Sequence, residues 1–353
     1  MPQLNKVCHL LSSLKIGGAE RFCIDLSLEQ QQMGYEVTII SFGSTNDELY
    51  NVAIKANINV IIFNKKWWSK NITLCSILKK FNILHLHSPV ILKVILLTLP
   101  LLTQQKIIYT RHGEGLYSEF IWKLTHKVAK PFISAVTFVS QNGQLVFNNI
   151  HRWSNIQQQV IENGISVTDD KVIETNSPTL RIGSVGRMVP LKSQKDLIQA
   201  WANLPESIKS NIELHLIGDG ECRQLLEKQA FSLNAQNSIF FHGFMSDRFK
   251  ILALFDLLVV SSESEGLSIA ILEAMAQQKP VIATNVGGNP RLIQNNITGV
   301  LYEYGDIKHL TSAILNYYKN PETLSQHGIN AQTHVKTNYS LNKTAREYDG
   351  LYQ

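Results

Sequence analysis

The sequence has little of what marks a nucleic-acid-binding or metal-binding protein. Charged residues make up only 17% of its 353 residues, and the net charge is +5. It lacks an arginine-rich run, so the modest basic excess favours an anionic small molecule or an acidic membrane surface over nucleic acid. No cluster of histidine, cysteine and carboxylate residues has the spacing of a zinc site. We therefore expect no nucleic acid partner, no bound metal and no cofactor.

Cysteines and long apolar runs are also scarce. The four cysteines, Cys8, Cys23, Cys75 and Cys222, are scattered without a C-x-x-C pair, as is typical of reduced core residues in a cytosolic protein. The N-terminus lacks the apolar region of an export signal. The most lipid-like stretch, residues 90–102, is interrupted and is shorter than the about 20 residues that span a bilayer. We expect a buried crossover helix there and a cytoplasmic protein.

Strand-like and helix-like segments alternate along almost the whole chain, which predicts an α/β fold of doubly wound parallel sheets. The expected strands are residues 6–11, 36–42, 60–63, 83–86, 106–110 and 135–139, and then 180–185, 212–217, 238–241, 257–260, 280–284 and 299–302. A polar stretch between the two sets indicates a linker. We predict domains at residues 1–165 and 181–335, a linker at 166–180, and a C-terminal helix within 336–353 that packs on the first domain.

Basic residues follow the first strand of the second domain. Gly186 and Arg187 come directly after this strand, and Lys192 precedes a helix that opens at Ser193. Ligands bind at the carboxyl ends of strands in open α/β sheets, and two cations at a helix entrance suit a diphosphate. The simpler interpretation is a pair of solvated surface bases, and we favour the diphosphate site because of its position.

Two glycine pairs lie at other strand ends. Gly17-Gly18 occupies the first strand-to-helix turn, where backbone amides can face a phosphate, but it does not form the G-x-G-x-x-G fingerprint. Gly218-Asp-Gly220 could approach a nucleotide base or ribose. For both pairs, an ordinary tight turn explains the sequence equally well.

Two glutamates, Glu265 and Glu273, lie eight positions apart in Glu265-Gly-Leu-Ser-Ile-Ala-Ile-Leu-Glu273. We place Glu265 in a loop and Glu273 about two turns inside the following helix, up to roughly 12 Å away. Glycosidase carboxylates lie about 5 to 10 Å apart across one bond, so this pair more plausibly grips two ends of an elongated ligand. Two solvated helix residues remain the alternative.

Histidines near strand ends are further candidates. His85 and His87 alternate on a strand, and we expect one of them to point into the core. His112 follows a strand and precedes Gly113, which makes it the better functional candidate.

Together these motifs resemble a known family, the retaining GT-B glycosyltransferases of family 4. The resemblance is carried by Gly17-Gly-Ala-Glu-Arg21, Val139-Ser-Gln141, Glu162-Asn-Gly-Ile165, Gly186-Arg187 with Lys192, Gly218-Asp-Gly220, His242-Gly-Phe244 and the segment from Glu265 to Glu273. It implies two Rossmann-like domains that face each other across a cleft, with the acceptor on the N-terminal side and a nucleotide-sugar donor mainly on the C-terminal side. One departure is Arg291, where many relatives carry a glutamate.

The resemblance also implies roles for single residues. Arg187 and Lys192 would hold the donor diphosphate in place of a metal ion, and Gly18 would approach it. Gly186, Gly218 and Gly220 are further expected donor-binding residues. Glu273 would bind the ribose, while Glu265 and the backbone of Gly266, Leu267 and Ser268 would address the sugar and phosphates. His112 would contact the transferred sugar from the opposite domain, and His242 and Phe244 would lie near the base. The expected catalytic residues are His112, Arg187, Lys192 and Glu265.

The implied function is transfer of a sugar from a nucleotide-diphosphate sugar, with UDP-sugar preferred, to a glycan or lipid-linked acceptor in polysaccharide or glycolipid synthesis. A sugar-nucleotide epimerase and a non-catalytic nucleotide-binding scaffold stay open as alternatives. Lys65-Lys-Trp-Trp-Ser-Lys70 resembles an interfacial anchor, although its indoles could instead fold onto the core. This segment suggests peripheral contact with the inner face of the cell membrane.

Overall fold

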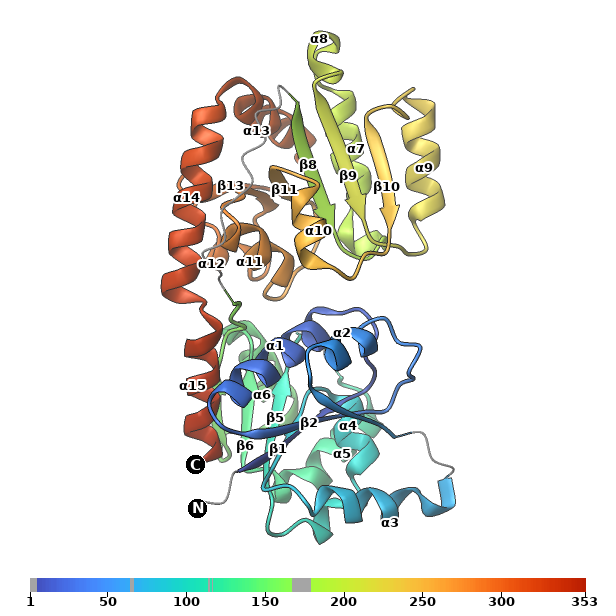
Figure 1. The fold of residues 1–353 in the computed structure, drawn as a ribbon, viewed down its shortest axis with the longest axis vertical. Coiled ribbons are helices and arrows are strands. Elements are labelled where there is room, and N and C mark those ends of the chain that lie inside the picture. The colour runs from blue at the N-terminus through green and yellow to red at the C-terminus, as the bar shows by residue number, and fades with distance from the viewer. Residues whose placement is uncertain (1–4, 64–66, 114, 116, 167–178) are drawn as a thin grey trace. The chain divides into compact units, whose positions relative to one another are not determined.

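The computed structural model describes residues 5–63, 67–113, 115, 117–166 and 179–353 (Figure 1). The chain divides into two compact units. Unit 1 comprises Met1–Gly164 together with Leu341–Gln353, and unit 2 comprises Ile165–Ser340. Each unit is built around one parallel sheet.

The sheet of unit 1 has seven parallel strands in the order β3-β2-β1-β4-β5-β6-β7. Its strands are β1 (Lys6–Leu11), β2 (Glu36–Ser41), β3 (Asn59–Ile62), β4 (Ile83–Leu86), β5 (Lys106–Arg111), β6 (Ala135–Phe138) and β7 (Gln157–Val160). The helical segments are α1 (Gly18–Gln32), α2 (Tyr50–Lys55), α3 (Trp67–Leu78), α4 (Pro89–Ile95), η1 (Leu99–Leu101), α5 (Phe120–Ala129), η2 (Lys130–Phe132), α6 (Gln141–His151) and α15 (Leu341–Tyr352).

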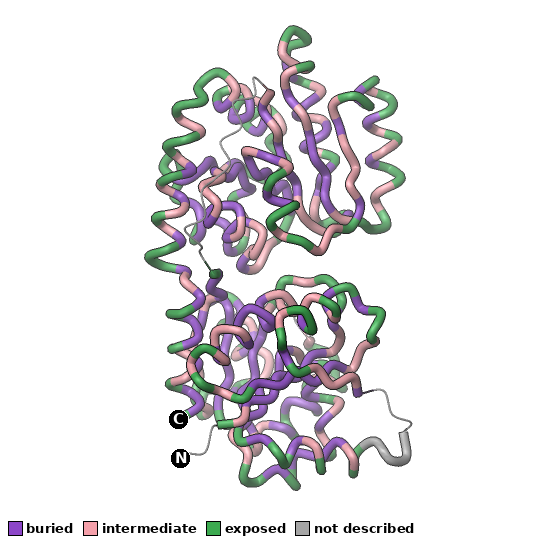
Figure 2. Tube along the Cα trace, in the orientation of Figure 1, coloured by how far each residue is buried: buried purple, intermediate pink, exposed green. Residues whose placement is uncertain are grey.

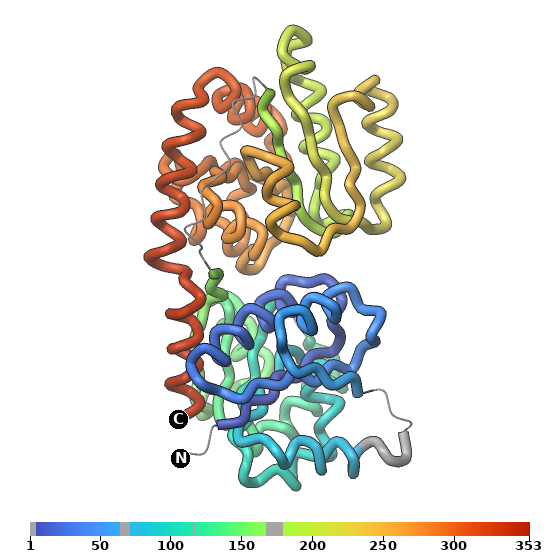
Figure 3. Tube along the Cα trace, in the orientation of Figure 1, coloured from blue at the N-terminus to red at the C-terminus, as the bar shows by residue number. Residues whose placement is uncertain are grey.

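The C-terminal helix α15 completes unit 1. In Figure 3 it is the red end of the tube, and it packs against α1. Tyr348 and Tyr352 of this helix are buried, and the Tyr352 hydroxyl lies 2.7 Å from Nδ1 of His85. Tyr35, which follows α1, donates a hydrogen bond to Asp349 of α15. Residues more than 300 positions apart therefore form one core.

The sheet of unit 2 has six parallel strands in the order β10-β9-β8-β11-β12-β13. Its strands are β8 (Leu180–Val185), β9 (Ile212–Ile217), β10 (Ile239–Gly243), β11 (Leu257–Val260), β12 (Val281–Thr284) and β13 (Gly299–Tyr302). The helical segments are η3 (Pro190–Lys192), α7 (Gln194–Ala202), α8 (Glu206–Lys209), α9 (Arg223–Ser232), α10 (Arg248–Ala253), α11 (Ile269–Ala276), α12 (Asn289–Leu292), α13 (Ile307–Lys319) and α14 (Pro321–Asn338).

Burial on both faces explains why the central strands are almost continuously apolar. All residues of β4, β6, β11 and β12 are buried. Figure 2 shows the buried stretches of both units in purple. A parallel sheet must be covered by helices on both sides, because each crossover returns over one of its faces. The observed fold confirms the predicted α/β class with two doubly wound parallel sheets.

Several local expectations were wrong. Strand β7 was missed, because its sequence Gln-Gln-Gln-Val is polar and it lies at the sheet edge, where one side is unpaired. The predicted buried helix at residues 90–102 is instead α4 followed by η1, and Leu97 and Leu101 are 74% and 57% exposed. Residues 167–178 of the predicted linker lie outside the described residues, and β8 begins at Leu180.

Both sheets reverse their strand order beside their first strand, between β1 and β4 and between β8 and β11. At such a switch point the neighbouring crossovers leave toward opposite faces of the sheet. A crevice for ligands therefore opens at the carboxyl ends of these two strands. The fold directs attention to the loops after β1 and β4 in unit 1 and after β8 and β11 in unit 2.

Two helical glycines provide a test of the packing. An added Cβ at Gly328 of α14 would lie 2.0 Å from the Gln278 carbonyl oxygen, whereas nothing lies within 4 Å at Gly350 of α15. We expect Gly328→Ala to lower the free energy of unfolding by about 1–3 kcal/mol, because the backbone must shift. Gly350→Ala should raise it by about 0.5–1 kcal/mol, because alanine favours the helix. Denaturant unfolding of both variants measures this, and equal effects would contradict the packing.

Candidate functional site

The loops after β8 and β11 meet at the switch point of unit 2. Lys192 Nζ lies 2.5 Å from Glu265 Oε1, and the two side chains are only 23% and 10% exposed. Ser262 donates a second hydrogen bond, of 2.7 Å, to the same carboxylate oxygen. The cation predicted for a phosphate is thus held in place by the first glutamate of the Glu265–Glu273 segment. Sequence reasoning placed both residues in the site but did not pair them.

Backbone hydrogen bonds fix these two loops to each other. The Glu263 amide donates to the Leu191 carbonyl at 2.9 Å, and the Ser261 hydroxyl donates to the Lys192 carbonyl at 2.9 Å. Because these bonds flank the ion pair, the position of Lys192 does not depend on one flexible side chain alone. The arrangement presents a fixed positive charge at the strand ends.

Arg187 differs from Lys192 in being exposed. It follows Gly186 at the end of β8, and its guanidinium forms no ion pair within the described part of the chain. A free guanidinium can donate two parallel hydrogen bonds to a phosphate. Arg187 is therefore the cation of this loop that remains available to an anion.

The glycines of the predicted Gly218-Asp-Gly220 motif have a packing role. A Cβ at Gly218 would lie 2.0 Å from the Gly186 carbonyl oxygen, and one at Gly220 would lie 2.4 Å from that of Met188. The Met188 amide in turn donates to the Asp219 carbonyl at 2.9 Å. These glycines let the loop after β9 support the Gly186 loop, so a direct ligand contact is not needed to explain them.

The segment from Gly266 to Ser268 leads into α11, and only part of it can reach a ligand. Leu267 is 7% exposed and packs in the apolar core, so its side chain does not face a ligand. Close backbone contacts hold this loop, since a Cβ at Gly287 would lie 1.8 Å from the Glu265 carbonyl oxygen and one at Gly288 would lie 2.2 Å from that of Gly266. Gly287 and Gly288 are site-supporting residues that motif reasoning did not identify.

Glu273 is the fifth residue of α11, because the helix begins at Ile269. It therefore lies little more than one turn inside the helix, and the expected two turns were wrong. Glu273 lines an open hollow of about 20 Å³, which has room for little more than one water molecule. The other lining residues are Ile165, Ser166, Arg248, Phe249, Leu252, Ala276 and Gln277. The hollow combines apolar walls with the charged groups of Glu273 and Arg248.

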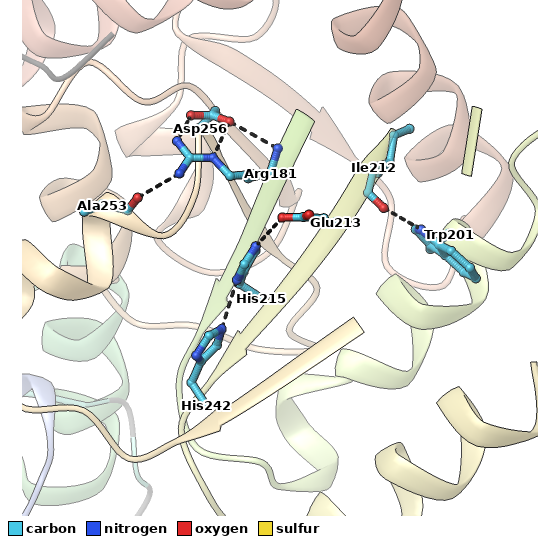
Figure 4. A network of polar contacts seen from close by, with 8 residues as sticks. All are labelled: Arg181, Trp201, Ile212, Glu213, His215, His242, Ala253 and Asp256. Carbon is cyan, nitrogen blue, oxygen red and sulfur yellow. Dashed lines mark hydrogen bonds and ion pairs between the residues drawn. The ribbon is translucent and has the colours of Figure 1, made fainter. Parts of the chain in front are cut away.

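His242 lies on β10 and not in the loop after it. Its Nε2 is 2.9 Å from Nδ1 of His215, whose Nε2 is 3.2 Å from Glu213 (Figure 4). Burial lowers the pKa of both histidines, so they are neutral at pH 7. The imidazole of His242 is thus committed to a structural network, whereas Phe244 beyond the strand is 39% exposed.

Gly18 and His112 are the two predicted site residues that lie in unit 1. Gly18 is the first residue of α1, and a Cβ at the preceding Gly17 would lie 2.1 Å from a Glu20 carboxylate oxygen, so an acidic group already sits beside this turn. His112 follows β5, and its Nε2 lies 2.8 Å from Nδ1 of His87.

His85 and His87, the other two histidines considered in the sequence, differ from expectation. Both His85 and His87 are buried, at 0% and 3% exposure, although only one was expected inside. They lie two residues apart along one extended stretch, so both side chains face the same side of the sheet. His87 bonds to His9, and His9 in turn bonds to Gln30; no local pattern in the sequence singles out either of these two residues.

Histidine burial predicts sensitivity to acid. Burial lowers the pKa of ten of the eleven histidines below the ordinary value of 6.5. Below about pH 6.5 the unfolded chain binds protons that the folded chain does not, so stability falls as the pH falls. For His151 the folded pKa is about 3. We expect His151→Asn to reduce proton uptake on unfolding at pH 5 by about one proton, measured from denaturation midpoints against pH. An unchanged slope would contradict the assignment.

Comparisons with known proteins agree with this architecture. Residues 16–169 match the model of Glycosyltransferase Family 4, and residues 167–334 match that of Glycosyl transferases group 1. The chain is 27% identical over 362 residues to a putative glycosyltransferase, EpsD, of Bacillus subtilis, covering 91% of this chain and 90% of that protein. It is 26% identical over 253 residues to N-acetyl-alpha-D-glucosaminyl L-malate synthase of Bacillus anthracis, covering 70% of this chain and 60% of that protein.

A solved structure shows the same fold. The crystal structure of Anabaena Alr3699/HepE in complex with UDP-glucose matches with a TM-score of 0.82 and 22% sequence identity, covering 98% of both chains. The two family models together extend from residue 16 to residue 334, so they include every described strand except β1. The protein has the GT-B fold and belongs to the family 4 glycosyltransferases.

Proposed function

We propose that this glycosyltransferase transfers a sugar from a UDP-sugar to a glycan or lipid-linked acceptor, with retention of configuration and without a metal ion. The observation that carries the proposal is the pairing of Lys192 with Glu265 beside the exposed Arg187 at the switch point of unit 2. UDP is the preferred carrier because the similar HepE structure was solved with UDP-glucose. An epimerase is not favoured, since both matching family models describe glycosyltransferases.

Charge is the basis for the proposed metal independence. When the bond between the anomeric carbon and the diphosphate breaks, negative charge grows on the departing oxygen. Arg187 and Lys192 would stabilise this charge, as fixed cations do in sites that exclude water. Glu265 would hold Lys192 in place, through the contact of 2.5 Å, before the donor arrives.

Retention is proposed from the family resemblance. The acceptor oxygen would attack the anomeric carbon from the side that the diphosphate leaves, and the hydroxyl proton would pass to the departing phosphate oxygen. UDP and the new glycoside are the products, and no protein nucleophile takes part. By the same resemblance, Glu273 would bind the ribose, and His112 would contact the sugar.

Donor binding and turnover test these roles. UDP-glucose at a hundredfold excess over its dissociation constant should stabilise the protein by about 2.7 kcal/mol. Glu273→Gln should weaken this binding, because a neutral amide pairs less well with the ribose hydroxyls, while Arg187→Ala should reduce kcat more than it raises KM. Lys195→Ala, which removes an exposed charge from α7 nearby, is the matched control. Wild-type turnover in both site variants would refute the assignment.

We also propose that the acceptor is reached at an anionic membrane surface. None of the described helices combines the length and apolar character needed to span a bilayer. The predicted anchor segment begins outside the described residues, and the side chains of Trp67 and Trp68 are not among those described. A better supported surface is α5, where Phe120 is 80% exposed and Leu124 and Val128 are 43% and 45% exposed.

Lysines accompany these apolar residues of α5. Lys123 and Lys127 are exposed on the same helix, and Lys93 of α4 lies 5.3 Å from the centre of the Trp122 ring. No acidic residue occurs between Phe120 and Phe132. An amphipathic helix with apolar and basic residues binds at the interface of anionic lipids.

Vesicle co-sedimentation tests this surface. We expect the protein to bind phosphatidylglycerol vesicles, to bind phosphatidylcholine vesicles weakly, and to lose about tenfold in affinity on combined Phe120→Ser and Leu124→Ser substitution. Phe231→Ser is the matched control, because Phe231 is 69% exposed on α9 of unit 2. Trp67→Ala with Trp68→Ala forms a third arm. Unchanged binding in the α5 variant would remove that helix from the proposal.

A further inference from the structure

A chain of hydrogen bonds connects Gln30 of α1 to His112 through two other histidines. Gln30 Oε1 lies 2.7 Å from His9 Nε2, His9 Nδ1 lies 2.9 Å from His87 Nε2, and His87 Nδ1 lies 2.8 Å from His112 Nε2. These residues come from α1, β1 and the ends of β4 and β5, around the switch point of unit 1. None of the motifs explains Gln30, His9 or His87.

All three rings are neutral at pH 7. Burial lowers the pKa of His9 to about 4 and that of His112 to about 3, and it also lowers the pKa of His87 well below its ordinary value. A neutral imidazole has one N–H and one lone pair, so a ring that donates through one nitrogen must accept through the other. Every bond in the chain therefore runs in the same direction.

Gln30 sets that direction. Its Nε2 donates to the Tyr352 hydroxyl at 3.1 Å, which leaves Oε1, an acceptor only, facing His9. His9 must then donate from Nε2 and accept at Nδ1 from His87. His87 in turn accepts at Nδ1 from Nε2–H of His112.

The chain ends in an unused acceptor. Once His112 donates through Nε2, its Nδ1 carries the lone pair. This atom is buried and has no hydrogen-bond partner within the structure as described. A buried acceptor left unpaired costs about 1–3 kcal/mol, so such an atom calls for a donor that is brought by a ligand.

We propose that Gln30, His9 and His87 are positioning residues that hold His112 in the Nε2–H tautomer, so that its Nδ1 accepts a hydrogen bond from a hydroxyl group of the bound sugar. The hydrogen bond to the sugar rests on the proposed function, whereas the tautomer of His112 does not. The consequence is a selectivity rule. A donor whose hydroxyl at that position is replaced by fluorine, which cannot donate, is discriminated against by the site.

The tautomer is measured directly on the ligand-free protein. Two-bond ¹H–¹⁵N correlation spectra of histidine-labelled protein report which ring nitrogen carries the proton. We expect Nε2–H in His9, His87 and His112. Nδ1–H in wild-type His112 would overturn the proposal, whether or not any variant folds.

Two variants then separate positioning from simple structural support. His87→Phe removes the acceptor for His112 and should give a mixture of tautomers at His112. His126→Phe is the matched control, because His126 is equally buried in unit 1 and bonds to Tyr109 and to the Trp122 carbonyl, outside the chain. The control should leave the His112 spectrum unchanged. A fixed Nε2–H signal in folded His87→Phe would show that His87 does not position the ring.

The ligand contact is tested with UDP-glucose and its monofluorinated analogues. At one hydroxyl position, fluorine should weaken binding to the wild type by about tenfold, and the difference should disappear in His112→Ala. Equal binding of all analogues would refute the acceptor role of Nδ1. If UDP-glucose itself does not bind, the proposed donor is wrong, while the tautomer measurement still decides the positioning role.

Discussion

The reversal of strand order beside the first strand of each sheet is the constraint on which both halves of the protein depend. At that point the crossovers separate to opposite faces, and the carboxyl ends of two adjacent strands are left open to a ligand. In unit 2 these ends carry Lys192 and Glu265, and in unit 1 they lie beside His87. Polar groups gather there because the remaining strand positions are needed for the apolar core.

The two units use opposite electrostatics at equivalent places in their folds. Unit 2 presents charged groups, with Lys192 held in place by the Glu265 carboxylate and Arg187 exposed to solvent. Unit 1 presents neutral imidazoles that are buried too deeply to ionise at pH 7. Cations suit a phosphate, whereas a neutral ring with a defined lone pair suits a hydroxyl group.

Glycines make the charged site possible by removing side chains where loops touch. Gly218 and Gly220 lie against the backbone of the Gly186 loop, and Gly287 and Gly288 lie against the backbone of the Glu265 loop. A methyl group at any of them would collide with a carbonyl oxygen of the neighbouring loop. The glycine-rich motifs are therefore better explained by contact between loops than by contact with a ligand.

The sequence by itself determined the two parallel sheets, because strands buried on both faces must be apolar and the gaps between them are long enough for helices. It also located Arg187, Lys192 and Glu265 at strand ends. The sequence did not predict the polar strand β7 or the exposure of Leu97, because position at the sheet edge and contacts with neighbouring helices decide these two features. Local patterns report the burial and backbone conformation of one segment at a time, and they predicted every described strand except β7.

Only the tertiary structure decided which of these residues meet. Lys192 and Glu265 are 73 positions apart, and Gln30 and Tyr352 are 322 positions apart, so no local pattern can pair them. Strand order brings the first pair together, and the docking of α15 brings the second. The Lys192–Glu265 pair fixes the position of the lysine charge. The Gln30–Tyr352 bond orients the histidine chain, so that Nδ1 of His112 is an acceptor. Both effects depend on the tertiary structure, because hydrogen bonds act only at contact distance.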